Sequence, residues 1–280
     1  MEFRELIVFL DEAADTGNLL RTATALARKH GARLTGAYVP SDSALRRRSD
    51  AFARGAGSEA VAAEYQTHED ESLSHAARQF AEAIEQNGVS GSWQAISCYA
   101  TAADIVVHAR YADLSIVGQR QERRARLWGP EDILLSLGGP TLIMPENPAI
   151  SDPVGDRILV AWNATREARR AVGDALPILA RAAQVTVLIV DPPALSAGPR
   201  PEPGANIARY LAAHGISPQL KCLASDGIDA GTVILREANA VGADMIVMGA
   251  YGHSRIVELV LGGATRTVLQ EAQLPVFMSH

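Results

Sequence analysis

Glycines near the carboxyl terminus give the chain its clearest pattern for chemistry. A strand-like run ends in Gly249-Ala250-Tyr251-Gly252, and Gly262-Gly263-Ala264-Thr265 follows after nine residues. Because glycine lacks a Cβ atom, it permits a tight turn and lets a ligand approach the backbone closely. The second group opens a helix-like stretch, whose free N–H groups and dipole favour an anion. The spacing therefore predicts a phosphate-binding site between a strand and a helix.

Segments typical of strands and helices alternate along all 280 residues. Apolar or strand-like runs predict strands at 5–10, 32–39, 93–98, 112–118, 140–144, 157–162, 185–190, 219–223, 243–249 and 274–278. Helical spacing predicts helices between them, among them 18–30, 58–86, 101–110, 205–214 and 230–240. Strands that alternate with helices form right-handed βαβ units, so the order predicts an α/β fold with parallel sheets.

The order of elements occurs twice, which indicates an internal repeat. The run 112–118 aligns with 243–249, and 139–144 with 274–279. Prolines and a glycine in 146–155 predict a linker, so we expect domains at 1–147 and 154–280. Each domain is expected to hold a five-stranded parallel sheet between helices, of the flavodoxin-like or adenine-nucleotide-hydrolase-like type. Asp113 and Asp244, which precede equivalent strands, are expected to be turn and capping residues.

Composition argues against two classes of partner. The net charge of −6 disfavours nucleic acid, which basic surfaces bind. No apolar run approaches the roughly 20 residues that span a bilayer, and the acidic start is unlike a signal peptide. We therefore expect a cytoplasmic protein that does not bind membranes. The two cysteines, Cys98 and Cys222, lie in strand-like stretches and are expected to be buried thiols.

These patterns together resemble a tandem universal stress protein, with two domains of that family in one chain. Nucleotide-binding members carry glycine, two residues, glycine, nine residues, and glycine followed by Ser or Thr. Gly249, Gly252 and Gly262 match this pattern. The resemblance implies that the second half binds ATP or a related adenine nucleotide, with or without Mg²⁺. The implied contact residues are Ala161, Trp162, Asn163, Ile189, Gly249, Gly252, His253, Gly262, Gly263, Ala264 and Thr265.

Several positions depart from the family pattern. Asn163 stands where an Asp commonly meets the nucleoside, and Gly263 stands where a hydroxyl residue follows the third glycine. In the first half, Gln121 replaces the second glycine and Trp128 falls opposite Gly263. We therefore expect a degenerate first-half motif, and a second-half site built mainly from backbone. Such a site favours binding over catalysis, so no catalytic residue and no metal site are predicted.

Three functions follow as hypotheses. The leading one is a stress-response sensor or regulator that binds an adenine nucleotide. The alternatives are a scaffold that acts through protein contacts without nucleotide, and a slow ATP hydrolase. A tight strand-to-helix connection without a ligand would also account for the glycines. The two halves are expected to pack as an intramolecular pseudo-dimer near their last strands; a homodimer and an unknown protein partner remain open.

Overall fold

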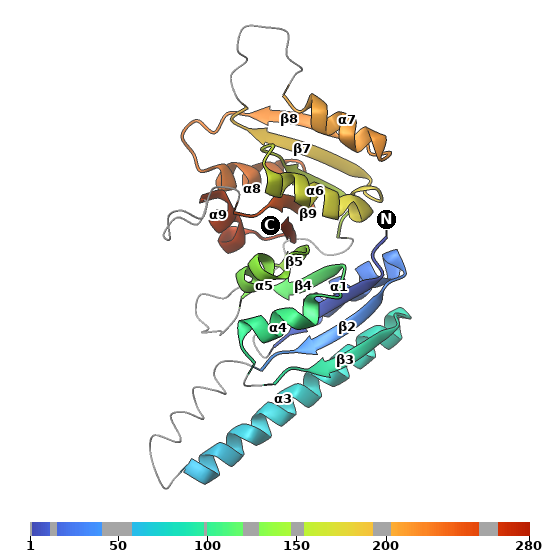
Figure 1. Ribbon diagram of the computed structural model, residues 1–280, viewed down its shortest axis with the longest axis vertical. Coiled ribbons are helices and arrows are strands. Elements are labelled where there is room, and N and C mark those ends of the chain that lie inside the picture. Colours follow the sequence, from blue (N-terminus) through green and yellow to red (C-terminus); the bar gives the residue numbers. More distant parts are fainter. Residues whose placement is uncertain are drawn as a thin grey trace. The chain divides into compact units, whose positions relative to one another are not determined.

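Alternating strands and helices build two units in the computed structural model (Figure 1). The units are Glu2–Leu137 and Gly138–His280. The structure describes residues 2–11, 16–40, 58–97, 100–119, 129–146, 154–192, 203–251 and 263–280, and for 58–69 it describes the backbone. Helix and strand labels follow Figure 1.

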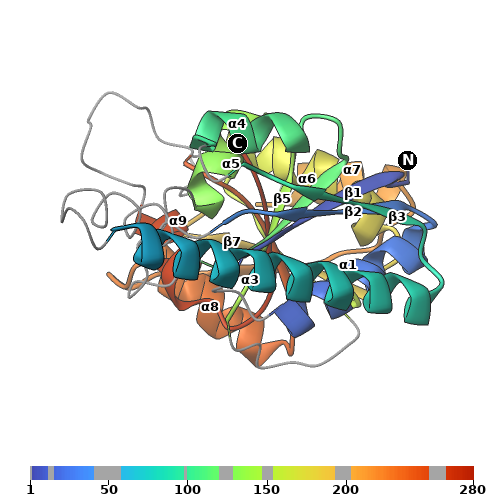
Figure 2. The ribbon, with the colours of Figure 1, turned by 90° about the horizontal axis from the view of Figure 1, so that it is seen from below.

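The N-terminal unit contains four parallel strands in the order β3-β2-β1-β4. The strands are β1 (Glu5–Leu10), β2 (Arg33–Tyr38), β3 (Gly91–Ala95) and β4 (Leu114–Gly118). The helices are α1 (Thr16–His30), α3 (Ser58–Asn87), α4 (Ala102–Ala109) and α5 (Pro130–Leu137). Helices α1 and α3 cover one face of the sheet, and α4 and α5 cover the other (Figure 2).

The C-terminal unit contains five parallel strands in the order β8-β7-β6-β9-β10. They are β6 (Arg157–Ala161), β7 (Gln184–Val190), β8 (Gln219–Leu223), β9 (Met245–Gly249) and β10 (Val276–Ser279). The helices are α6 (Arg166–Leu179), α7 (Ala205–Ala213), α8 (Ala230–Ala240) and α9 (Gly263–Glu271). Helices α6 and α7 lie on one face, whereas α8 and α9 lie on the other (Figure 2).

A sixth strand, β5 (Thr141–Met144), pairs with the edge of this sheet. It runs antiparallel to β10, with Leu142 opposite Phe277. The pairing satisfies backbone groups that β10 would otherwise present at an open edge. The last strand of the first half is therefore part of the C-terminal unit. The predicted domain limits, 1–147 and 154–280, stay a prediction, because 147–153 lies outside the described residues.

Central strands have the composition of strands that are covered on both faces. Ile158, Leu159 and Val160 of β6 are consecutive and all buried, as expected of a parallel strand between two helical layers. Strand β8 lies at the end of the sheet order and is largely accessible. Cys222 of β8 is exposed, so the prediction of a buried thiol there was wrong, because an edge strand leaves one face uncovered. Cys98 lies outside the described residues.

One contact recurs in both units and attaches the fourth strand of each to its first. Asp244, next to β9, accepts hydrogen bonds from the backbone N–H groups of Gly155 and Arg157, both at 2.8 Å, and from that of Asp156. Asp113, next to β4, accepts from Arg4 and Glu5 in the same way, at 2.6 and 3.0 Å. The expected structural role of both aspartates is confirmed.

Helix α6 approaches β9 so closely that Gly249 cannot carry a side chain. A Cβ atom at this position would lie 2.4 Å from the backbone N of Ala168 and from the carbonyl carbon of Glu167. Both atoms belong to the first turn of α6. The glycine that ends β9 thus fixes where α6 begins above the sheet.

None of the helices in the described ranges is both long enough and apolar enough to cross a bilayer.

We expect Asp244→Asn to destabilise the C-terminal unit by about 1–3 kcal/mol, because the amide N–H₂ would face buried backbone donors. Urea unfolding followed by circular dichroism measures the change. Asp113→Asn is the control, since the exposed Asp113 site lets water replace the lost bonds. Equal stability of Asp244→Asn and the unmodified protein would contradict the anchoring role of this carboxylate.

We expect Gly249→Ala to lower the free energy of unfolding by at least ~1–3 kcal/mol, because backbone atoms of α6 occupy the Cβ position. Gly173→Ala is the matched control. Gly173 lies inside α6, and an added Cβ would meet only the flexible end of Arg169. This control should be neutral or stabilising, because alanine favours a helix more than glycine does. A Gly249→Ala protein as stable as Gly173→Ala would contradict the close approach.

Candidate functional site

A pocket of about 200 Å³ opens at the carboxyl edge of the C-terminal sheet. Its floor comes from three neighbouring strands: Ala161 of β6, Leu188 and Val190 of β7, and Met248 and Gly249 of β9. Ala161 pairs with both Leu188 and Met248, so these three side chains point to the same side of the sheet. The carboxyl edge of a parallel sheet is where open α/β folds bind ligands.

Two helices supply one wall of this pocket. Ala230 and Ile234 lie one turn apart on α8 and face it together. Gly263, Ala264 and Thr265 form the first turn of α9, whose backbone N–H groups have no acceptor within the helix. The wall therefore combines apolar surface with potential donors for a ligand.

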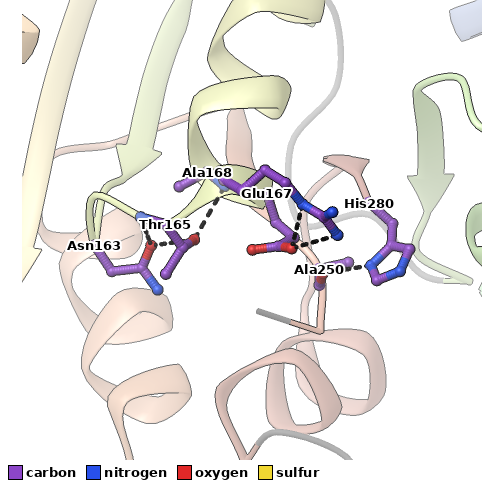
Figure 3. Close-up of polar contacts among 7 residues, drawn as sticks. Asn163, Thr165, Glu167, Ala168, Ala250 and His280 are labelled. Carbon is purple, nitrogen blue, oxygen red and sulfur yellow. Dashed lines mark hydrogen bonds and ion pairs between the residues drawn. The ribbon is translucent and has the colours of Figure 1, made fainter. Parts of the chain in front are cut away.

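The opposite side of the pocket is a polar turn after β6 (Figure 3). The Oδ1 atom of Asn163 accepts hydrogen bonds from the N–H and the hydroxyl of Thr165, at 3.2 and 2.8 Å. The hydroxyl oxygen of Thr165 accepts in turn from the N–H of Ala168, which caps α6. Between Asn163 and Thr165, Ala164 has a φ of 59°, a left-handed conformation that is unfavourable for alanine. The Asn163 side chain thus holds a strained turn at the rim of the pocket.

A second strained turn follows β9. Tyr251 has a φ of 57°, and its N–H donates to the Thr265 hydroxyl at 3.3 Å. Thr265 is buried, so this bond joins the end of β9 to the first turn of α9. The hydroxyl that the sequence offered for a phosphate already accepts a backbone hydrogen bond.

Strained residues gather at this edge of the sheet. In the described residues, the left-handed positions other than glycine are Ala164, Asp191, Asp226 and Tyr251. They follow β6, β7, β8 and β9 respectively. Such strain is found preferentially at functional sites, and here Ala164, Asp191 and Tyr251 adjoin residues that line the pocket.

Charged groups lie around the pocket, whereas its described lining is neutral. Glu167 is buried in the first turn of α6 and pairs with Arg166 at 3.0 Å. Burial raises the pKa of the Glu167 carboxyl, but hydrogen bonds from its own backbone N–H and from Arg166 outweigh this effect and hold the pKa below its usual value. Hydrogen bonds with Ser225 likewise lower the pKa of Asp191. Both carboxylates are therefore held in the ionised form beside the site.

His280 completes the polar surroundings on the side of β10. Its Nδ1 atom lies 3.0 Å from the carbonyl oxygen of Ala250 (Figure 3). The His280 ring also meets the ring of Tyr251 edge-on. These contacts hold His280 against the turn that follows β9. In the described ranges, no three His, Cys, Asp or Glu side chains gather closely enough to hold a metal ion.

Most of the residues proposed from the sequence meet at this pocket. Those that line it are Ala161, Trp162, Asn163, Gly249, Gly263, Ala264 and Thr265. Gly252, His253 and Gly262 lie outside the described residues, as do Gln121 and Trp128 of the first half. Ile189 is not part of the described lining. Its side chain packs on the other face of the sheet, next to Gly204: a Cβ atom on Gly204 would lie 2.9 Å from Cδ1 of Ile189.

Sequence reasoning missed six lining residues, and the signals for them were partly available. They are Thr165, Leu188, Val190, Ala230, Ile234 and Met248. Alternation along β7 implies that Leu188 and Val190 share a face that Ile189 does not, but the run is apolar throughout, so the pattern could not indicate which face holds the pocket. Ala230 and Ile234 had helical spacing, but no sequence signal places α8 beside α9.

Comparisons with known proteins agree with this architecture. The sequence model of the Universal stress protein family matches residues 155–280. A universal stress protein from Archaeoglobus fulgidus has a similar structure, with a TM-score of 0.70 and 16% identity over 98% of this chain and 97% of that one. A functionally unknown protein from Pseudomonas aeruginosa gives a TM-score of 0.63 and 18% identity over 99% and 92% of the two chains.

The same fold also occurs in a different setting. The cytoplasmic domain of a prokaryotic cation chloride cotransporter has a TM-score of 0.52 and 14% identity, over 99% of this chain and 95% of that one. None of the curated proteins compared with the chain matches it. Identities this low establish similarity of fold over nearly the whole chain, whereas the family match is specific to the C-terminal part. Residues 155–280 therefore match one domain of the universal stress protein family.

Proposed function

We propose that this chain is a stress-response protein that binds ATP or a related adenine nucleotide through its C-terminal unit, and that it acts as a sensor or regulator. One observation carries the proposal: the pocket at the carboxyl edge of β6, β7 and β9 is closed by the first turn of α9. The match of residues 155–280 to the universal stress protein family supports it.

The two kinds of wall suit the two parts of such a ligand. Leu188, Val190, Ile234 and Met248 offer an apolar surface to a flat base. The Asn163 side chain amide and the backbone N–H groups of α9 offer polar contacts to the sugar and to oxygens attached to it. The strained turns at Ala164 and Tyr251 support a functional role for this edge.

The proposed role is binding rather than turnover. Apolar side chains and backbone donors hold a ligand, but they do not transfer protons at neutral pH. The carboxylate of Glu167, in the first turn of α6, is engaged by Arg166 at 3.0 Å. A slow ATP hydrolysis would be incidental to binding.

The wider organisation remains part of the proposal. We propose that the N-terminal unit is a second universal stress protein domain with a degenerate motif, and that the two halves form a pseudo-dimer in a cytoplasmic protein. The pairing of β5 with β10 supports this arrangement, because it joins the last strand of the first half to the last strand of the second. Mg²⁺ would accompany ATP through the phosphates.

We expect Ala161→Phe to weaken binding of adenosine, AMP and ATP by about tenfold or more, which corresponds to ~1.4 kcal/mol. Ala161 lies at the centre of the pocket floor and is only half-buried, so a phenyl ring can fill the space of the base. Isothermal titration calorimetry measures the affinities. Ala212→Phe, at an exposed position on α7, is the matched control and should bind like the unmodified protein.

Thermal unfolding of both variants checks that they fold. Nucleotide released from the freshly purified protein by denaturation adds an independent readout. Absence of binding to the unmodified protein at millimolar adenosine, AMP and ATP would refute the proposal and favour a scaffold. Metal-dependent release of phosphate from ATP at a substantial rate would instead favour an enzyme.

A further inference from the structure

Asp229 lies at the junction of the two helices that wall the pocket. It is the N-cap residue of α8, and its Oδ2 atom accepts a hydrogen bond from the N–H of Thr232 at 3.2 Å. The next residue, Ala230, lines the pocket. The bond to Thr232 fixes the direction of the carboxylate, although the residue as a whole is exposed.

Two glycines make room for this carboxylate. A Cβ atom on Gly263 of α9 would lie 2.8 Å from Oδ1 of Asp229. A Cβ atom on Gly231 of α8 would lie 2.8 Å from Oδ2, and equally close to the carbonyl oxygen of Ala264 and to Cβ of Thr267 on α9. These distances are shorter than real Cβ contacts allow. The carboxylate is therefore packed against the first residue of α9, at the pocket wall to which Gly263 and Ala264 belong.

This position places a negative charge where a phosphate would be bound. The first turn of a helix favours an anion because of its free N–H groups and its dipole. Asp229 already supplies an anion beside the first turn of α9. A phosphate group bound at the same turn would lie close to this carboxylate, and the two like charges would repel each other.

We infer that Asp229 determines how tightly the pocket holds the phosphate groups of its ligand: the charge of Asp229 opposes them, so that ATP binds less tightly than it would without this carboxylate, whereas the binding of the adenosine moiety is unaffected. The inference rests on the proposed function, because it concerns the ligand of the same pocket. Asp229 acts on specificity through its charge and takes no part in a reaction.

The test compares adenosine with ATP in the unmodified protein and in Asp229→Asn. Asparagine keeps the N-cap acceptor for Thr232 while it removes the charge. Calorimetric titrations in EDTA keep divalent cations from shielding the two anions. We expect Asp229→Asn to bind ATP at least about fivefold more tightly, the order of magnitude for two unit charges some 4 Å apart in water. Adenosine should bind both proteins with equal affinity.

Asp226→Asn is the charge-matched control. Asp226 is exposed in the turn that precedes α8, and asparagine tolerates its left-handed φ of 50°. This control should bind ATP as the unmodified protein does. If adenosine binds but ATP affinity is the same with and without the Asp229 charge, the inference is wrong while the proposed function stands. If neither ligand binds either protein, both fail.

A stability measurement tests the packing of the carboxylate separately from any ligand. We expect Gly263→Ala to lower the Tm of the protein that carries Asp229, because the added methyl group meets Oδ1 and displaces the carboxylate from its N-cap bond to the N–H of Thr232. In an Asp229→Ala background the same change should leave the Tm unchanged or raise it, because alanine favours a helix. Equal losses of Tm in both backgrounds would contradict the placement of the carboxylate against α9.

Discussion

The close contact between the backbones of β9 and of the first turn of α6 determines where the polar turn at the rim of the pocket lies. Gly249 brings α6 to the sheet without an intervening side chain. The chain that links β6 to α6 is consequently short and bends through the left-handed Ala164, with Asn163 and Thr165 held against each other. This turn forms one rim of the pocket, whose floor at Ala161 and Met248 lies on the face of the sheet that α8 and α9 cover. The close packing of α6 therefore requires glycine at position 249, independently of the phosphate-binding role that the sequence predicted.

The pocket has a different chemical character at each end. Apolar side chains of β7, β9 and α8 form the end that suits a base, while the end at α9 combines helix N–H groups with the carboxylate of Asp229. Gly263, which departs from the hydroxyl residue of the family pattern, has a structural explanation in this arrangement: the carboxylate occupies the volume into which a side chain would extend. The Thr265 hydroxyl, in turn, accepts a hydrogen bond from Tyr251 and joins two segments of the site.

The sheet edge explains how the first half contributes to the second unit. Strand β10 would present unpaired backbone groups at its outer edge, and β5 pairs with them in antiparallel register. The predicted approach of the two last strands is confirmed in this pairing. The sequence also indicated a linker at 146–155, but a linker pattern marks exposed chain and carries no information about which sheet the preceding strand joins.

Of the pocket floor, the sequence indicated only Ala161 and Gly249, together with most of the rim. Local patterns were sufficient for the order of strands and helices and for the α/β class, because apolar periodicity and glycine spacing act between near neighbours. They placed β8 and α8 at their observed limits and put Asn163, Gly249 and Gly263 at one edge of a sheet. Tertiary structure alone decided which face of β7 turns toward the pocket, so that Leu188 and Val190 line it and Ile189 does not. It also placed Asp229 against Gly263, because that contact depends on how α8 and α9 pack against each other. The two residues are far apart in the sequence, and no periodic pattern in the sequence indicates that they meet.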